Sequence, residues 1–204
     1  MLRVDRLQVH DLPALSFDVP EGECFAVEGP SGSGKTLLLR AIADLDPADG
    51  YVTLDGVERG EMKPQDWRRQ VRYVAAEPAW WLGTGRAHFP GGLAERMARM
   101  MHAVDLDEAQ LDQPVHQLSR GEQQRLALVR AVIDDPKVLL LDEPTAALDT
   151  ATAAQIEELI KFQLLAGRRI VLVSHDPAQV NRLSHQRLIL GAKRRGGAIA
   201  RTLP

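Results

Sequence analysis

Hydrophobic and polar residues alternate over residues 2–20, a pattern that predicts two antiparallel strands joined by a turn near Asp11-Leu12-Pro13. The segments Val138–Leu141 and Ile170–Ser174 are instead apolar at almost every position, which is typical of strands buried on both faces of a parallel sheet. Further short strands are predicted at Cys24–Val27, Tyr51–Gly56, Val71–Ala75, Leu188–Leu190 and Ala198–Ala200.

Helical patterns lie between these strands. Apolar residues follow Thr36 at helical spacing, and further helices are predicted at Leu93–Val104, Gln123–Ile133, Thr150–Leu165 and Pro177–Leu183. This alternation of strands and helices predicts an α/β domain with a mostly parallel central sheet. Residues 77–118 change in character, and we expect a short helical insertion there. The chain is therefore expected to form one domain over 1–204, with its core in 1–76 and 119–204.

Composition narrows the possible partners. The net charge of −3 and the isoelectric point of about 6.1 give no indication of a nucleic-acid-binding surface. The single cysteine, Cys24, lies in an apolar strand, which favours a buried thiol and fits a reducing cytoplasm. The aliphatic runs are far shorter than the roughly 20 residues of a membrane span, and the N-terminus has no signal-peptide core. Any membrane role is therefore expected to require a partner.

The stretch after the first buried strand matches the phosphate-binding pattern G-x-x-x-x-G-K-[ST]. Its glycines let successive backbone N–H groups turn toward phosphate oxygens, and the following helix directs the positive end of its dipole to the same place. Lys35 supplies a charge for the β- and γ-phosphates, and the Thr36 hydroxyl is a ligand for Mg²⁺. We therefore predict a nucleoside triphosphate site at Gly29, Pro30, Ser31, Gly32, Ser33, Gly34, Lys35 and Thr36.

Polar side chains also follow two of the buried strands. Asp142 and Glu143 come after Val138–Leu141, at the strand end where ligands of open α/β sheets bind. Asp142 is predicted to hold Mg²⁺, and Glu143 to polarise a water for attack on the γ-phosphate. His175 ends the next buried strand, where it can bond the γ-phosphate or orient the water. The alternatives are an acidic turn and a structural histidine, and the phosphate loop upstream favours function.

A third candidate lies at the start of a helix. Ser119 and Glu122 form the capping box S-x-x-E, which by itself explains only a well-made helix start. The Ser119 hydroxyl and the Gly121 backbone also make this N-terminus an anion site. Because the chain already has a phosphate loop, this second site makes sense if it faces a nucleotide held by another copy.

These motifs together resemble those of the ATP-binding subunits of ABC transporters. Gly29–Thr36 resembles their Walker A motif, Leu118–Glu122 their signature, Leu139–Glu143 their Walker B motif, Ala147-Leu148-Asp149 their D-loop and His175 their switch histidine. The resemblance implies a P-loop NTPase core with an N-terminal antiparallel β subdomain and a short helical insertion. It also implies a head-to-tail homodimer that encloses ATP and Mg²⁺ between the phosphate loop of one copy and Ser119–Glu122 of the other.

The sequence departs from the family pattern at several positions. Ala76 stands where a glutamine is usual, and Glu77 is the neighbouring side chain that can substitute for it. Leu37 replaces a frequent hydroxyl, and the usual adenine-stacking aromatic is missing, with His10 near its place. Trp80-Trp81 falls where a membrane partner would dock. These tryptophans are either a contact surface or an anchor for the helical insertion.

The resemblance implies an ATP hydrolase on the inner face of the cell membrane, bound to a separate membrane permease. The alternatives are a cytosolic ATPase of the same type that regulates cell division or cofactor biogenesis, and a nucleotide-dependent binding module with weak turnover. A permease gene adjacent on the chromosome would favour the first interpretation.

Overall fold

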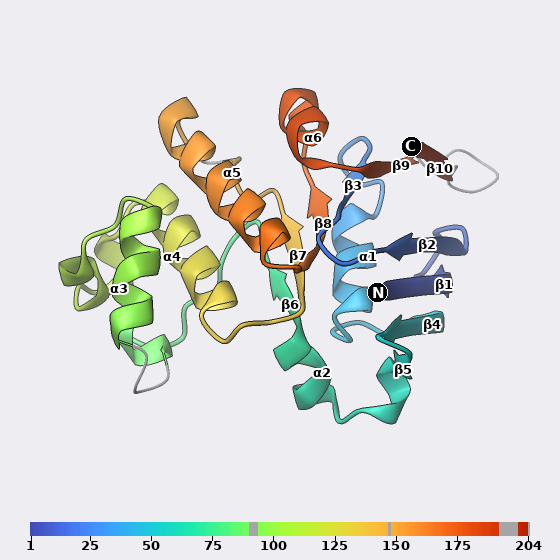
Figure 1. Ribbon diagram of the computed structural model, residues 1–204, viewed down its shortest axis with the longest axis horizontal. Coiled ribbons are helices and arrows are strands. Elements are labelled where there is room, and N and C mark those ends of the chain that lie inside the picture. The colour runs from blue at the N-terminus through green and yellow to red at the C-terminus, as the bar shows by residue number, and fades with distance from the viewer. Residues whose placement is uncertain (90–93, 147, 192–199, 204) are drawn as a thin grey trace.

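The computed structural model describes residues 1–89, 94–146, 148–191 and 200–203, and it contains two sheets (Figure 1). The larger sheet has strand order β10-β9-β3-β8-β7-β6. All neighbours in it pair in parallel except β10, which is antiparallel to β9. Its strands are β3 (Cys24–Glu28), β6 (Val71–Val74), β7 (Val138–Asp142), β8 (Arg169–Val173), β9 (Gln186–Leu190) and β10 (Ala200–Leu203).

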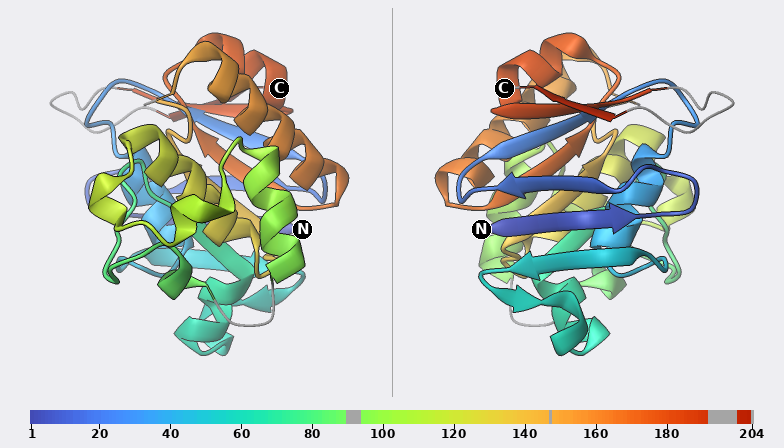
Figure 2. Two further views of the ribbon diagram at one scale, coloured as in Figure 1. Left: turned by 90° about the vertical axis from the view of Figure 1, so that its left-hand side faces the viewer. Right: turned by 90° about the vertical axis from the view of Figure 1, so that its right-hand side faces the viewer.

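The smaller sheet is antiparallel and has the order β2-β1-β4-β5. It comprises β1 (Leu2–Gln8), β2 (Leu15–Val19), β4 (Asp49–Leu54) and β5 (Val57–Glu58). One face of this sheet is turned outward in the right-hand view of Figure 2, and its other face covers α1 (Lys35–Ile42). The alternating pattern of residues 2–20 therefore predicted this hairpin correctly.

Side chains of the central strands alternate between two apolar clusters. One cluster contains Val138 and Leu140 and includes α1 and the small sheet, and the stacked rings of Phe17 and Phe25 join the two sheets with centroids 4.2 Å apart. The other cluster contains Leu139 and Leu141 and includes α3 (Ala94–Ala103), α4 (Arg120–Val132) and α5 (Thr150–Leu165). Burial on both faces explains why these strands are apolar throughout.

The predicted α/β class with a mostly parallel sheet is confirmed, and most predicted elements are present. The helices α5 and α6 (Pro177–Leu183) have the predicted bounds. The helix predicted at Gln123–Ile133 begins instead at Arg120, because the capping box at Ser119 starts it there. Of the strand predicted at Ala198–Ala200, residues 198 and 199 lie outside the described residues, and β10 begins at Ala200.

Several short elements were not predicted. Helix α2 (Pro64–Gln70) has proline at its start, and it carries the fully buried Trp67, whose Nε1–H donates to the carbonyl of Ile42 at 2.9 Å. Short 3₁₀ helices were also missed; they lie at Arg59–Glu61, Arg86–His88, Glu108–Leu111 and Val115–Gln117. Such segments are too short to show a clear period in the sequence.

Residues 77–118 contain α3 and three of these 3₁₀ helices, and among the described residues no strand of either sheet lies between β6 and β7. In the left-hand view of Figure 2, α3 stands in front of α4 and faces outward. None of the helices in the described ranges combines the length and the apolar composition that a membrane-spanning helix needs.

Candidate functional site

The phosphate-binding loop connects β3 to α1. Three of its glycines have positive φ values, with Gly29 at 147°, Gly32 at 76° and Gly34 at 98°. The loop is closed by a hydrogen bond from the Ser33 N–H to the Pro30 carbonyl at 3.2 Å. An added Cβ at Gly29 would lie 2.3 Å from the carbonyl oxygen of Leu190, so the loop passes against β9 where only glycine fits.

The two polar side chains at the start of α1 have different partners. Lys35 is buried, and its Nζ donates to the carbonyls of Gly29 at 2.8 Å and Pro30 at 3.1 Å, across the loop. Thr36 Oγ1 donates to Asp142 Oδ2 at 2.7 Å. The predicted magnesium residues are therefore in contact, and both offer the oxygen ligands that Mg²⁺ prefers.

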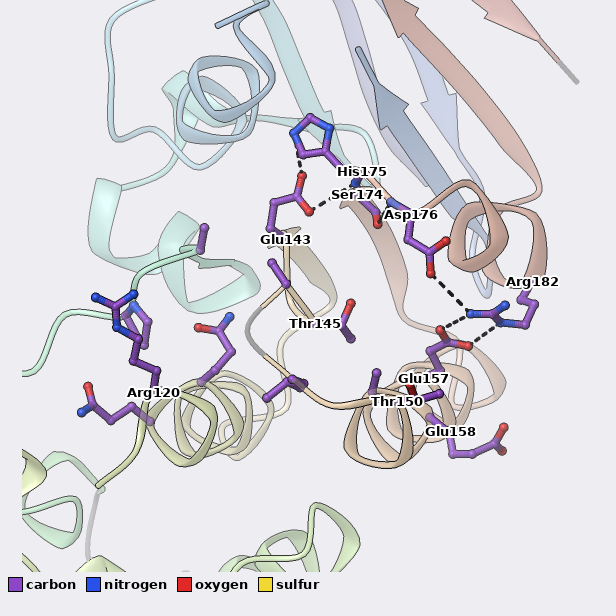
Figure 3. Close-up of a pocket in the computed structure, with 18 of the residues that line it drawn as sticks. Arg120, Glu143, Thr145, Thr150, Glu157, Glu158, Ser174, His175, Asp176 and Arg182 are labelled. Atoms are coloured by element: carbon purple, nitrogen blue, oxygen red, sulfur yellow. Dashed lines mark hydrogen bonds and ion pairs between the residues drawn. The ribbon is translucent and has the colours of Figure 1, made fainter. Parts of the chain in front are cut away.

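Glu143 and His175 form a pair at the ends of β7 and β8. The His175 N–H donates to Glu143 Oε2 at 3.2 Å, and His175 Nε2 lies 3.2 Å from Glu143 Oε1 (Figure 3). Glu143 has a φ of 49°, which is strained for a residue with a side chain, and its N–H donates to the Val173 carbonyl at 3.0 Å. The turn thus directs the carboxylate toward the histidine.

These groups share one cavity. A pocket of about 290 Å³ is lined by Asp142, Glu143 and His175 together with part of the phosphate loop, namely Ser31, Gly32, Gly34, Lys35 and Thr36. Gly29, Pro30 and Ser33 of the predicted site are not among its lining residues. The residues predicted for phosphate, metal and water therefore converge at the carboxyl edge of the sheet, as the motif spacing indicated.

Burial changes the proton affinity of this site. It raises the pKa of Glu143 above the usual carboxyl range, and His175 and Lys35 oppose this change. It also lowers the pKa of Lys35, against the attraction of Glu143 and Asp142. A raised pKa makes the Glu143 carboxylate a stronger base than an exposed glutamate.

Sequence reasoning missed Tyr73 on β6. Its hydroxyl donates to Asp142 Oδ2 at 3.1 Å, next to the bond from Thr36. Burial and then the Asp142 charge raise the pKa of Tyr73. The only signal in the sequence was a hydroxyl-bearing side chain within a short predicted strand, which does not identify its partner.

The capping box at Ser119 is present. Ser119 Oγ accepts from the Glu122 N–H at 3.2 Å, and the Ser119 N–H donates to Glu122 Oε2 at 2.7 Å. Glu122 also accepts a hydrogen bond from Gln110, and these bonds lower the pKa of its carboxyl group. Among the described residues, none of Leu118–Glu122 lines the pocket that contains Lys35.

A larger groove of about 1210 Å³ lies beside the phosphate pocket, and Glu143 and His175 line both. Figure 3 shows Arg120 on one side of this groove and Arg182 on the other. Arg182 forms bonds of 2.7 and 2.8 Å with the buried Glu157. Leu148 also lines the groove, and Asp149 caps α5, whereas Ala147 of the predicted D-loop lies outside the described residues.

The departures from the family pattern are visible in the structure. Ala76 and Leu37 line the phosphate pocket, so apolar groups occupy positions that commonly carry polar ones. Glu77 lines the larger groove and is not among the residues of the phosphate pocket. His10 is exposed and has a φ of 49° at the turn after β1.

The two adjacent tryptophans have different environments. Trp80 packs against the cluster that contains α3 and α4, whereas Trp81 is 71% exposed. The guanidinium of Arg130 lies 4.3 Å from the ring centre of Trp80 and 5.1 Å from that of Trp81. His88 Nε2 accepts from the N–H groups of Trp81 and Leu82. The exposed Trp81 ring is thus packed against His88 and Arg130.

The chain matches the family model described as ABC transporter over residues 12–146. It is 37% identical over 203 residues to Protein STAR1 of Oryza sativa subsp. japonica, covering 95% of this chain and 58% of that protein. It is also 38% identical to the Fe(3+) ions import ATP-binding protein FbpC of Mesorhizobium japonicum, covering 82% of this chain and 50% of that protein. The chain thus spans about half the length of these curated relatives.

Solved structures show the same fold. A dimeric bacterial ABC transporter cassette has a TM-score of 0.82 and 25% identity and covers 94% of each chain. An ATP-binding subunit of an ABC transporter has a TM-score of 0.85 and 25% identity and covers 97% of this chain and 90% of that one.

A matched pair of glycine substitutions tests the geometry of the phosphate loop. Gly29→Ala places a methyl group against the Leu190 carbonyl, whereas a methyl at Gly32 has nothing within 4 Å. We expect Gly32→Ala to lower the free energy of unfolding by about 1–2 kcal/mol through its φ alone. Gly29→Ala is expected to cost about 2–3 kcal/mol more through the clash. Urea unfolding measures both, and equal losses would contradict the loop structure.

Proposed function

The chain belongs to the ABC transporter family, and we propose that it is an ATP-binding subunit that hydrolyses ATP in a head-to-tail homodimer and thereby drives a separate membrane permease. The observation that carries the proposal is the single pocket in which Lys35, Asp142 and Glu143 meet. Phosphate binding, metal binding and water activation each have a residue of suitable chemistry there.

The phosphate loop supports nucleotide binding. The backbone N–H groups of the loop and the N-terminus of α1 are suited to the phosphate oxygens. Lys35 now bonds two loop carbonyls, and a triphosphate offers it stronger, charged acceptors in their place. Thr36 and Asp142 would hold Mg²⁺, which neutralises phosphate charge when bound.

Glu143 is proposed as the residue that takes a proton from the attacking water. Its raised pKa suits a general base, because base strength increases with pKa. His175 contacts this carboxylate through its backbone N–H and its ring, and so orients it. The exposed ring of His175 can also reach toward a bound γ-phosphate.

A second copy is proposed to complete the site. Ser119 is exposed at the N-terminus of α4, where its hydroxyl can still donate after accepting from Glu122. The backbone N–H groups of this helix start, with Gly121 in its first turn, suit the phosphates of a nucleotide held by the other copy, and Glu122 holds Ser119 in place through the capping box. The dimeric cassette among the similar structures supports this arrangement.

The permease is proposed to dock at Trp81. The ring is exposed, His88 and Arg130 pack against it, and it follows Ala76 and Glu77 closely in the chain. Because Ala76 cannot bond a phosphate or a metal, movement of the partner would be transmitted through the backbone and Glu77. The site of action would be the inner face of the cell membrane.

The Glu143→Gln variant tests the hydrolytic and dimeric parts of the proposal. The neutral amide binds no proton, so we expect ATP turnover to fall by about 100-fold or more. The unhydrolysed nucleotide should hold the dimer together, and size-exclusion chromatography with Mg-ATP would show this. Glu108→Gln, at an exposed site, is the matched control. Lys35→Ala should remain monomeric, and a Glu143→Gln protein that also does so would contradict the dimer.

Trp81→Ala tests the docking surface. We expect the variant to lose the integral-membrane protein that purifies with wild type from native membranes, while it binds ATP with unchanged affinity. Phe162→Ala removes an aromatic ring that is 62% exposed on α5 and serves as the control. Equal recovery of the membrane protein with both variants would reject Trp81 as the contact.

A further inference from the structure

The Tyr73 hydroxyl reaches the metal site because of strand register. Tyr73 pairs with Leu140 across β6 and β7, so the two side chains lie on the same face of the sheet. Asp142 is two residues beyond Leu140 and is on that face as well. Helix α1 packs on this face, which brings Thr36 to the same carboxylate.

Both hydroxyl groups donate to one carboxylate oxygen. Asp142 Oδ2 accepts from Thr36 Oγ1 at 2.7 Å and from the Tyr73 hydroxyl at 3.1 Å. Asp142 is only 3% exposed, so both bonds are made to a largely buried carboxylate. Two donors from different elements fix the plane of the carboxylate more firmly than either does alone.

We propose that Tyr73 is a positioning residue for Asp142, and that its hydroxyl sets the affinity of the nucleotide-bound site for its divalent cation. This inference rests on the proposed function, because it assumes that Asp142 holds the metal that accompanies ATP. Tyr73 itself would touch neither the metal nor the nucleotide. It would act by holding Asp142 Oδ2, as outer-shell hydrogen bonds do at many metal sites.

The composition of the pocket explains why such support matters in this chain. Side-chain oxygens in the described lining of the phosphate pocket come from Ser31, Thr36, Asp142 and Glu143. Glu143 is in contact with His175, and Ala76 brings no polar atom. The cation would therefore depend on few protein ligands, and an unsupported Asp142 would lower its affinity.

Tyr73→Phe removes the hydroxyl and keeps the ring that packs against the α1 cluster. Tyr51→Phe is the matched control, because Tyr51 is the other of the two tyrosines and is 51% exposed. Asp142→Asn serves as the positive control. The affinity for a fluorescent ATP analogue is measured once in chelator and once in saturating Mn²⁺. By linkage, the ratio of the affinity in Mn²⁺ to the affinity in chelator reports how tightly the nucleotide-bound site holds the metal. Thermal unfolding without ligands is measured in parallel.

We expect Tyr73→Phe to lower this ratio by about tenfold, the lower end for loss of an outer-shell bond. Its affinity in chelator should equal that of wild type, and Tyr51→Phe should match wild type in both conditions. An unchanged ratio would overturn the proposal. So would a parallel loss of metal-free binding or of thermal stability, which would assign Tyr73 a structural role.

The two levels of the account fail in different ways. A wild-type protein that binds no nucleotide even in Mn²⁺ would reject the proposed function and, with it, this assignment. If the wild-type protein binds nucleotide more tightly in Mn²⁺ than in chelator, and the Tyr73→Phe variant shows the same ratio of affinities, only the assignment of Tyr73 is rejected.

Discussion

The parallel pairing of β3, β8 and β7 is the constraint on which the site depends. Val27 pairs with Val173, and Val173 pairs with Asp142, so the three strands end on adjacent positions of one sheet edge. The residues that follow are therefore forced together, although about 145 residues separate the first of them from the last. Because alternate side chains of these strands pack into two different apolar clusters, a shift of register by one residue would move each side chain into the wrong cluster, and this fixes the register.

The two apolar clusters on either side of this sheet support different candidate sites. Helix α1, which carries Thr36, and the small sheet cover the face of the large sheet that carries Tyr73 and Asp142, and so support the metal site. Helices α4 and α5 cover the other face, and α4 presents Ser119 at a separate place. A chain built this way holds a phosphate loop and a spare helix N-terminus apart, which is the physical reason for proposing that it acts in pairs.

Local patterns in the sequence were sufficient to predict the phosphate loop, the capping box and the long helices. Each depends on residues that are close in the chain, such as Ser119 with Glu122 or the glycines before Lys35. The bond from Tyr73 to Asp142 depends on pairing between β6 and β7, which no local pattern contains. Likewise, only packing against the cluster that contains α3 and α4 distinguishes the anchored Trp80 from the exposed Trp81.

The central claim is that one nucleotide lies between Lys35 of one copy and Ser119 of another, and cross-linking tests it directly. Ser31 and Ser119 are both exposed and can be replaced together by cysteine in a Glu143→Gln chain, while the native Cys24 is buried and unreactive. With Mg-ATP and a short thiol cross-linker, the account predicts covalent dimers on a denaturing gel and none without nucleotide. A cross-link within single chains would contradict it.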